Sequence, residues 1–281
     1  MSLVSYGTLG DYIIEKLQCW FVDMISPRQN TTKLRECIDE LATNYDCPIV
    51  MSTARFDSVY FELMPVQQQR VDEICGQELS ELMSTGFFIS IGVAYPRGII
   101  ECINRPDYSQ ADIKSWNRYA AHYSKINSIL DIIAKEIAII FDGIPIPATL
   151  SGFAKAVEHV TDYFPLTISH RAIAEKAGLG WRGKNGLIIH EKYSCALRFA
   201  SVITKTQFIP GKKKENQCKD CTACEDACSF IRNKEKLKDY RENCRKYITH
   251  LQKIGLNEEV CGKCIKACLM RSIYKDQFTL G

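Results

Sequence analysis

Cysteine is the residue type through which this sequence could do chemistry. The chain has 281 residues and 14 cysteines, eight of which lie between Cys218 and Cys268. In a large chain without an export signal, such a group is more typical of a metal site than of disulfides. The sequence therefore predicts a metal centre near its C-terminal end.

The first four of these cysteines have a spacing that iron–sulfur proteins use. They form the pattern C-x2-C-x2-C-x3-C over Cys218, Cys221, Cys224 and Cys228. In bacterial ferredoxins the fourth cysteine of this pattern ligates the other cluster of a pair. Three closely spaced thiolates bind one face of a 4Fe–4S cube. The loop is too short to bring the fourth thiolate of the run to the same cube. A ligand from elsewhere in the chain must close each cube.

The second group of cysteines supplies the missing ligands, because exchanging the outer cysteines of the two groups gives two complete sets. Cluster 1 is predicted to be held by Cys218, Cys221, Cys224 and Cys268. Cluster 2 is predicted to be held by Cys228, Cys244, Cys261 and Cys264. Two alternatives stay open: a disulfide framework, and zinc, although structural zinc sites usually pair two separated C-x2-C knuckles.

The remaining cysteines show no ligand spacing, and we interpret them as small buried hydrophobic residues: Cys19, Cys37, Cys47, Cys75, Cys102 and Cys195.

Charge divides the chain into two parts. From residue 205 onward, 17 Lys and Arg stand against 10 Asp and Glu, a balance of +7, whereas residues 1–204 carry −4. We therefore predict two domains, 1–204 and 205–281. Each 4Fe–4S core with four thiolates carries about −2, so part of the positive charge compensates the clusters. The remaining positive charge forms either a solvated face or a docking face for an acidic electron donor or for RNA.

The apolar runs and the N-terminal residues indicate where in the cell the protein is located. The apolar runs fall short of the ~20 residues that a membrane-spanning helix needs. The first residues lack the basic and apolar regions of a signal peptide. We expect a cytoplasmic protein that does not contact a membrane.

The elements that must position the cysteines are those of an α/β domain. The continuous apolar run from Phe87 to Tyr95 predicts a buried strand, and Ser109 resembles the N-cap of a long helix that follows. Helices and strands alternate through residue 204, which is typical of the α/β class. The other predicted elements are a helix over Val71–Met83, a loop over Gly143–Gly152, a helix over Ser169–Ala177, and a strand pair formed by Leu187–His190 and Ala196–Thr204.

A glycine-rich loop lies between that short helix and the strand pair. Gly178-Leu-Gly-Trp-Arg-Gly183 matches G-x-G-x-x-G, but the dinucleotide-binding fingerprint needs a strand before it and a helix after it. The order here is reversed, so we reject that interpretation. The loop, with Trp181 and Lys184, is either a tight turn or a place where backbone comes close to a large flat ligand or a cluster domain.

The segment from Ala174 to Lys184 resembles the core motif of the epoxyqueuosine reductases, which follow it with a strand pair and two interleaved 4Fe–4S motifs. The tract Arg241–Thr249, around the isolated Cys244, is also similar, and a tract containing Tyr123 matches in part. That family is related to the reductive dehalogenases. The resemblance implies a cobalamin-binding α/β domain of nitroreductase-like type, followed by a small bacterial-ferredoxin-like domain with two 4Fe–4S clusters.

The resemblance also implies an activity. The chain is expected to be an oxidoreductase in which electrons pass from a donor, such as a ferredoxin or flavodoxin, through two clusters to cobalamin. The cobalamin would then reduce an organic substrate such as a modified tRNA base. Family members that act on tRNA continue into a helical-repeat region, which we expect this chain to lack because 13 residues follow Cys268. The alternative is a non-catalytic electron-transfer or accessory protein without cobalamin.

The same resemblance implies site residues. Asp162 stands three residues before Pro165, as the family's proton-donating aspartate does, and its apolar neighbours suit a raised pKa. Tyr163 and His170 are further candidate acids. The residues implied in cobalamin binding are Tyr123, Gly178, Gly180, Trp181, Gly183 and Lys184.

Overall fold

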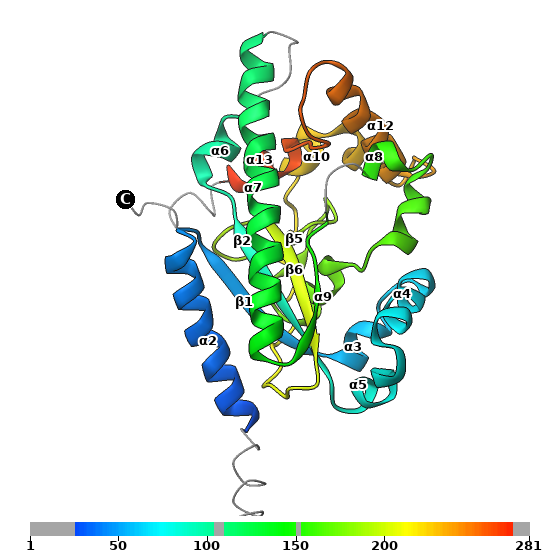
Figure 1. The fold of residues 1–281 in the computed structure, drawn as a ribbon. Coiled ribbons are helices and arrows are strands. Elements are labelled where there is room, and N and C mark those ends of the chain that lie inside the picture. Colours follow the sequence, from blue (N-terminus) through cyan, green and yellow to red (C-terminus); the bar gives the residue numbers. More distant parts are fainter. Residues whose placement is uncertain (1–25, 104–109, 150–152, 272–281) are drawn as a thin grey trace, which may run out of the picture.

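The computed structural model describes residues 26–103, 110–149 and 153–271. A four-stranded antiparallel sheet lies at its centre, with the strand order β1-β2-β6-β3 (Figure 1). The strands are β1 (Ile49–Arg55), β2 (Phe87–Ala94), β3 (Gly143–Ile146) and β6 (Leu197–Thr204). Every residue of β2 is buried, as its continuous apolar sequence predicts, because β2 lies inside the sheet and helices cover both faces.

The first face of the sheet is covered by α2 (Pro27–Asn44) and the long α7 (Gln110–Ile140). In Figure 1, α7 crosses in front of the strands and α2 lies beside β1. Apolar residues at helical spacing on α7, among them Leu130 and Ile133, are fully buried against the sheet. The predicted N-cap of this helix, Ser109, lies outside the described residues.

The opposite face packs against a second apolar core. Phe88 of β2 and its neighbour Ile203 of β6 turn their side chains into it, because alternate residues of a strand point to opposite faces. A single helix over Val71–Met83 is a wrong prediction: the chain breaks at Gly76, where φ is +50°, a value that glycine adopts without a Cβ clash. The elements here are α3 (Phe56–Tyr60), α4 (Pro65–Cys75), the 3-10 helix η1 (Gly76–Glu78), α5 (Leu79–Thr85) and α9 (His170–Lys176).

Two predicted features between residues 143 and 204 are corrected. The segment predicted as a loop begins with β3, which pairs with β6, and its Pro145 is tolerated because β3 is an edge strand. The predicted partner of β6 pairs elsewhere: β5 (Ile188–Ile189) pairs with β4 (Trp181–Arg182) inside the glycine-rich loop. The short-helix prediction is confirmed as α9, whose N-cap Ser169 accepts a hydrogen bond from a backbone N–H.

The cysteine-rich segment after β6 is mainly helical and shares the first core. Leu251, Leu256 and Leu269 are buried in the same apolar cluster as the α7 side chains. At Gly262 an added Cβ would lie 2.3 Å from Cδ1 of Ile103. The apolar core is thus continuous between the sheet and this segment, and the division at residue 205 stays a proposal. The helices are α10 (Ala223–Ala227), α11 (Ser229–Arg232), α12 (Tyr240–Lys253) and α13 (Lys263–Leu269).

Three short elements complete the described chain: α6 (Arg97–Glu101), α8 (Phe153–Ala156) and the 3-10 helix η2 (Val160–Leu166). Among the helices of the described ranges, none combines the length and apolar character needed to cross a membrane.

Candidate metal centre

The first cysteine run is shaped by backbone turns. The N–H of Cys221 donates to the carbonyl of Cys218 at 2.8 Å, and the Asn216 side chain accepts from the N–H of Cys218 at 2.8 Å. Cys224 lies in α10. Cys228 follows in extended backbone, with φ −141° and ψ 112°, so the chain changes direction at the cysteine that is predicted to serve the other cluster.

The cluster 1 cysteines lie together, although the fourth belongs to the second run. Helix α10 packs against α13, which carries Cys268. Cys224 is close enough to Cys268, Cys218 and Cys221 for their charges to act on it. Burial, followed by these neighbouring thiols, raises the pKa of Cys224 to about 11.

The cluster 2 cysteines also lie together. Cys244 of α12 is near Cys261 and Cys228, and burial followed by these thiols raises its pKa to about 12. Cys264 is near the same three thiols and also near Cys224, so the two sets adjoin. Each of the eight thiols therefore has neighbours from the set that the ligand exchange assigns to it.

A hollow of about 650 Å³ opens beside the predicted cluster 2 cysteines and is lined in part by Cys228, Cys244 and Cys261. Tyr247 and Lys263 line it as well: Nζ of Lys263 donates to the Tyr247 hydroxyl at 2.7 Å and lies 4.5 Å from the ring centroid. Crowded buried thiols suit a cofactor whose iron charge offsets that of several thiolates. Within the described ranges, no three His, Cys, Asp or Glu side chains are arranged to hold a single metal ion.

The glycines of the glycine-rich loop approach the protein's own backbone. At Gly178, φ is +72° and an added Cβ would lie 2.1 Å from the carbonyl oxygen of Lys212. At Gly180 and Gly183 it would lie 2.2 Å and 2.4 Å from atoms of Ile189. The chain's own atoms fill the space where a Cβ would lie at all three positions, which accounts for glycine there.

The same loop contacts the first cysteine run. Nζ of Lys184 lies 3.8 Å from the carboxylate of Glu225 on α10. The side chain of Asn216, which also holds Cys218, donates to the carbonyl of Arg182 at 3.0 Å. Trp181 is buried, and its indole N–H has no hydrogen-bond partner among the described residues. The loop therefore adjoins the first cysteine run.

Tyr123 is held by a neighbouring cation. The guanidinium of Arg198 lies 4.3 Å from the centroid of the Tyr123 ring and donates to its hydroxyl at 3.3 Å. Both side chains also donate to the carbonyl of Thr149, at 3.2 Å from Tyr123 and 2.6 Å from Arg198. Tyr123 is thus engaged within the protein and only 5% exposed.

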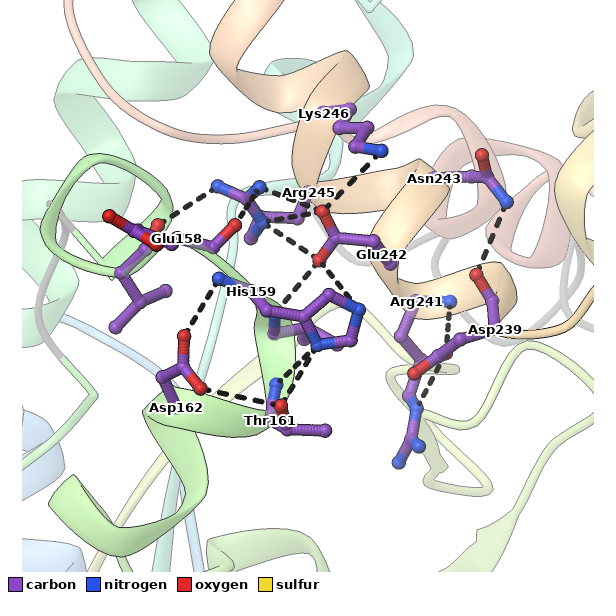
Figure 2. A network of polar contacts seen from close by, with 12 residues as sticks. Glu158, His159, Thr161, Asp162, Asp239, Arg241, Glu242, Asn243, Arg245 and Lys246 are labelled. Carbon is purple, nitrogen blue, oxygen red and sulfur yellow. Dashed lines mark hydrogen bonds and ion pairs between the residues drawn. The ribbon is translucent and has the colours of Figure 1, made fainter.

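Asp162 is exposed and takes part in the capping box of η2 (Figure 2). Its carboxylate accepts from the backbone N–H of His159 at 2.9 Å. Beside it, the buried Glu242 of α12 accepts from the N–H of Val160 at 2.8 Å and is paired with Arg245 at 2.7 Å. The Arg245 hydrogen bonds, with smaller contributions from the N–H of Val160 and from His159, lower the pKa of Glu242 to about 2. This network fixes the turn that carries Asp162, whose role as proton donor stays a prediction.

The other two candidate acids lie deeper. His170 is buried, with Nδ1 2.9 Å from the Ser201 hydroxyl and Nε2 2.8 Å from the carbonyl of Pro147. Burial lowers its pKa to about 4. A neutral ring that donates from Nε2 and accepts at Nδ1 satisfies both contacts, so His170 serves the core. Burial raises the pKa of the half-buried Tyr163.

Sequence reasoning missed two residues near the predicted cluster 1 cysteines. Cys195 is buried as predicted, and it is near enough to Cys268 for each thiol to affect the pKa of the other. The amide of Asn185 donates to the Cys195 sulfur at 3.5 Å. The Cys195 contact is the main cause that holds the pKa of Cys268 below its usual value. A lone cysteine has no spacing signal, and the contact joins residues far apart in the sequence.

Comparisons with known proteins point to one family, although no family model matches the chain. The epoxyqueuosine reductase of Bacillus cereus is 43% identical over 61 residues, which are 22% of this chain and 16% of that protein. That of Lactococcus garvieae is 24% identical over 229 residues, 77% of this chain and 60% of the relative.

The comparison with solved structures also finds epoxyqueuosine reductases. An epoxyqueuosine reductase from Streptococcus thermophilus has a TM-score of 0.47 at 19% identity, covering 86% of this chain and 66% of that one. A second structure, with an epoxyqueuosine-modified tRNA stem loop, has a TM-score of 0.41 at 21% identity and covers 72% and 53%. The chain spans at most about two thirds of any of these four relatives.

The fold is mixed α/β, and gathered thiols of this kind are consistent with iron–sulfur clusters. By sequence, the chain is a distant homologue of the epoxyqueuosine reductases, which are oxidoreductases.

Proposed function

We propose that this chain is an iron–sulfur reductase of the epoxyqueuosine reductase type. Its eight gathered cysteines would hold two 4Fe–4S clusters, through which electrons from a donor such as a ferredoxin or flavodoxin reach an organic substrate. The observation that carries the proposal is that Cys228 lines one hollow with Cys244 and Cys261, while α10, which carries Cys224, packs against α13, which carries Cys268. An exchange of the outer cysteines would complete two cubes from the two runs, and the distant homology supports the same class of reaction.

Clusters of this type, when bound, supply one-electron transfer at low potential. The chain would deliver four sulfurs to each. Burial raises the pKa of the Cys244, Cys261 and Cys264 thiols, so binding of iron must displace their protons. The excess of positive charge in residues 205–281 offsets the negative charge that the loaded centre carries.

Packing within the protein already accounts for several of the residues implied in cobalamin binding. The glycines from Gly178 to Gly183 face the protein's own atoms, and Tyr123 is engaged by Arg198. This packing favours a second candidate function, an electron-transfer or accessory protein that uses the clusters without cobalamin. The first candidate takes as substrate a modified tRNA base, of the kind present in the stem loop of one related structure.

Metal analysis of protein prepared without oxygen tests the proposal. About eight irons and about eight sulfides per chain are expected. Colourless protein, or zinc in place of iron, would contradict both candidates. Gel filtration after addition of hydroxocobalamin separates them: cobalt that co-elutes with intact clusters supports the reductase, and intact clusters without cobalt support the electron-transfer protein.

A further inference from the structure

We propose that the hollow beside the predicted cluster 2 cysteines is the docking site of an acidic electron-carrier protein, so that electrons enter the chain at cluster 2. The inference rests on the proposed function, which requires a donor of electrons. It goes beyond that function because it assigns the donor to one surface of the protein and to one of the two clusters.

The hollow joins predicted cluster ligands to the protein surface. Cys228, Cys244 and Cys261 belong to its lining. Other residues of the lining are exposed to solvent, namely Asp226, Ala227, Ser229 and Arg232. A cluster held by these cysteines would therefore lie close to solvent at this hollow. Electron transfer between proteins requires such closeness, because its rate falls steeply with the distance between the two redox centres.

Apolar side chains form much of the remaining lining. Phe230 and Tyr247 pack edge to face, with ring centroids 6.2 Å apart, and Met270 belongs to the same lining. Aromatic residues and methionine are enriched at the centres of protein interfaces, where charged residues are depleted. The hollow therefore offers an apolar centre to a protein partner.

The lining also carries three cations, Arg232, Lys263 and Lys266. Nζ of Lys263 donates to the Tyr247 hydroxyl at 2.7 Å, and Nζ of Lys266 donates to the carbonyl of Glu101 at 2.7 Å. Both acceptors are uncharged, so these bonds fix the ammonium groups without cancelling their charge. The acid among the described lining residues, Asp226, lies 3.4 Å from Arg232.

Charge decides which kind of partner fits this surface. From residue 205 onward the chain carries +7, and two loaded clusters would contribute about −4, which leaves about +3. Lys236 and Lys238 follow Arg232 along the chain, are exposed, and form no ion pair within the described ranges. An acidic protein surface is complementary to this face, and such complementarity raises the rate of association.

The glycine-rich loop lies beside the first cysteine run, on which most of cluster 1 depends. Nζ of Lys184 lies 3.8 Å from the carboxylate of Glu225, and Asn216, which holds Cys218, donates to the carbonyl of Arg182 at 3.0 Å. Contacts with the rest of the protein thus occupy the surroundings of that run, whereas the hollow opens beside the cluster 2 cysteines. We expect electrons to pass from the donor to cluster 2 and from there to cluster 1.

The step transfers one electron, and flavodoxin is the probe for it because it is an acidic carrier protein. Its flavin is first reduced to the anionic hydroquinone. When the hydroquinone gives up one electron it becomes the neutral semiquinone, and the core of cluster 2 gains one negative charge. No proton is transferred in this step.

Stopped-flow spectroscopy of anaerobically prepared full-length protein measures the second-order rate constant of the step. In the wild type this rate constant should fall at least about tenfold between about 0.01 M and about 1 M salt, because salt screens the attraction. Lys263→Gln removes one cation but keeps a donor for Tyr247, and should lower the rate constant about threefold at low salt. Lys263→Arg keeps the charge and should restore most of the rate.

Lys135→Gln is the matched control. Lys135 is an exposed lysine of α7, sixteen residues beyond Tyr119, which lies next to Gly262. Sixteen residues of helix span about 24 Å, so the rate constant of this variant should equal that of the wild type.

Each charge variant should keep about eight irons per chain. Each should also reach the same final reduction with photoreduced deazaflavin, a small donor that needs no docking site. If Lys263→Gln loses iron, Arg232→Gln tests the same hollow through a residue outside the second cysteine run.

Single cysteine variants identify the cluster that receives the electron. Cys224→Ala should keep cluster 2 and Cys228→Ala should keep cluster 1, each with about four irons. Reduced flavodoxin should reduce Cys224→Ala faster than Cys228→Ala. The opposite order would refute entry at cluster 2.

The remaining outcomes separate this inference from the proposed function. Wild-type rate constants in both Lys263→Gln and Arg232→Gln, at about eight irons, would refute the docking site and leave the clusters standing. A rate constant that does not depend on salt would refute an acidic partner. If Lys263→Gln weakens binding of a tRNA stem loop and leaves the flavodoxin rate unchanged, the hollow binds RNA and the inference is wrong. Wild-type protein without iron would overturn the proposed function itself.

Discussion

The exchange of Cys228 and Cys268 between the two cysteine runs can be tested by counting iron in double variants. Cys228 lies near Cys244, Cys261 and Cys264, so Cys228→Ala should remove one of the four ligands of cluster 2. Cys224→Ala, the matched variant four residues earlier in the same run, should damage cluster 1. Each single variant is expected to fall from about eight irons to about four.

The double variants distinguish the exchange from the simple alternative in which each run holds its own cluster. With the exchange, Cys224→Ala combined with Cys228→Ala removes both clusters, and iron should fall to near zero. Cys228→Ala combined with Cys244→Ala touches cluster 2 twice, so about four irons should remain. Anaerobic iron and sulfide analysis measures both. The reverse result, with about four irons in the first double variant and almost none in the second, would refute the reasoning from spacing and from the structure alike.

Three other predictions concern residues outside the eight cysteines. Burial lowers the pKa of His170 in the folded protein to about 4, below its ordinary 6.5. The contribution of His170 to the free energy of unfolding is therefore fully present above about pH 6.5. It should fall by up to about 3 kcal/mol as the pH drops towards 4. Anaerobic urea unfolding between about pH 7 and pH 5 should show this loss, and a His170→Gln variant with the same pH dependence would exclude His170 as its cause. Gly178→Ala would place a Cβ 2.1 Å from the Lys212 carbonyl at φ +72°, and should lower the free energy of unfolding by at least 1–2 kcal/mol; a wild-type thermal midpoint would show that the loop adapts. Asp162→Asn should keep both clusters by iron analysis and slow substrate turnover, and unchanged turnover would assign the proton to another group.

The central strand could be predicted from the sequence because its signal is local, whereas the division of the cysteines into two ligand sets stays a prediction. A continuous apolar run predicts β2, since a strand buried on both faces needs no polar alternation. The cysteine spacing predicts which thiols gather, since reach along the chain decides which ligands can share a cube.

Other features could not be predicted because they depend on tertiary contacts. The strand β3 contains Gly143 and Pro145, which are typical of loops, and is a strand because β6 offers it an edge. Likewise, β5 pairs with β4 and not with β6. The sequences of two adjacent apolar runs do not determine which strand each one pairs with. Asn185 reaches Cys195, and Cys195 comes near Cys268, only through folding.

The glycine-rich loop shows where motif reasoning succeeds and where it needs the structure. The order of the flanking elements excludes a dinucleotide site, since phosphates bind where a strand is followed by a helix N-terminus. The glycines are still required, because Gly178 and Gly180 meet backbone carbonyl oxygens and Gly183 leaves room for Asn185. Close packing beside a metal centre and close packing beside a phosphate can thus require the same glycine motif. Contacts in the structure, such as the one between Asn216 and Arg182, distinguish the two cases. The segment that resembles the family's core motif is hydrogen-bonded through Asn216 to the turn that carries Cys218, so a change in the loop should affect Cys218 first.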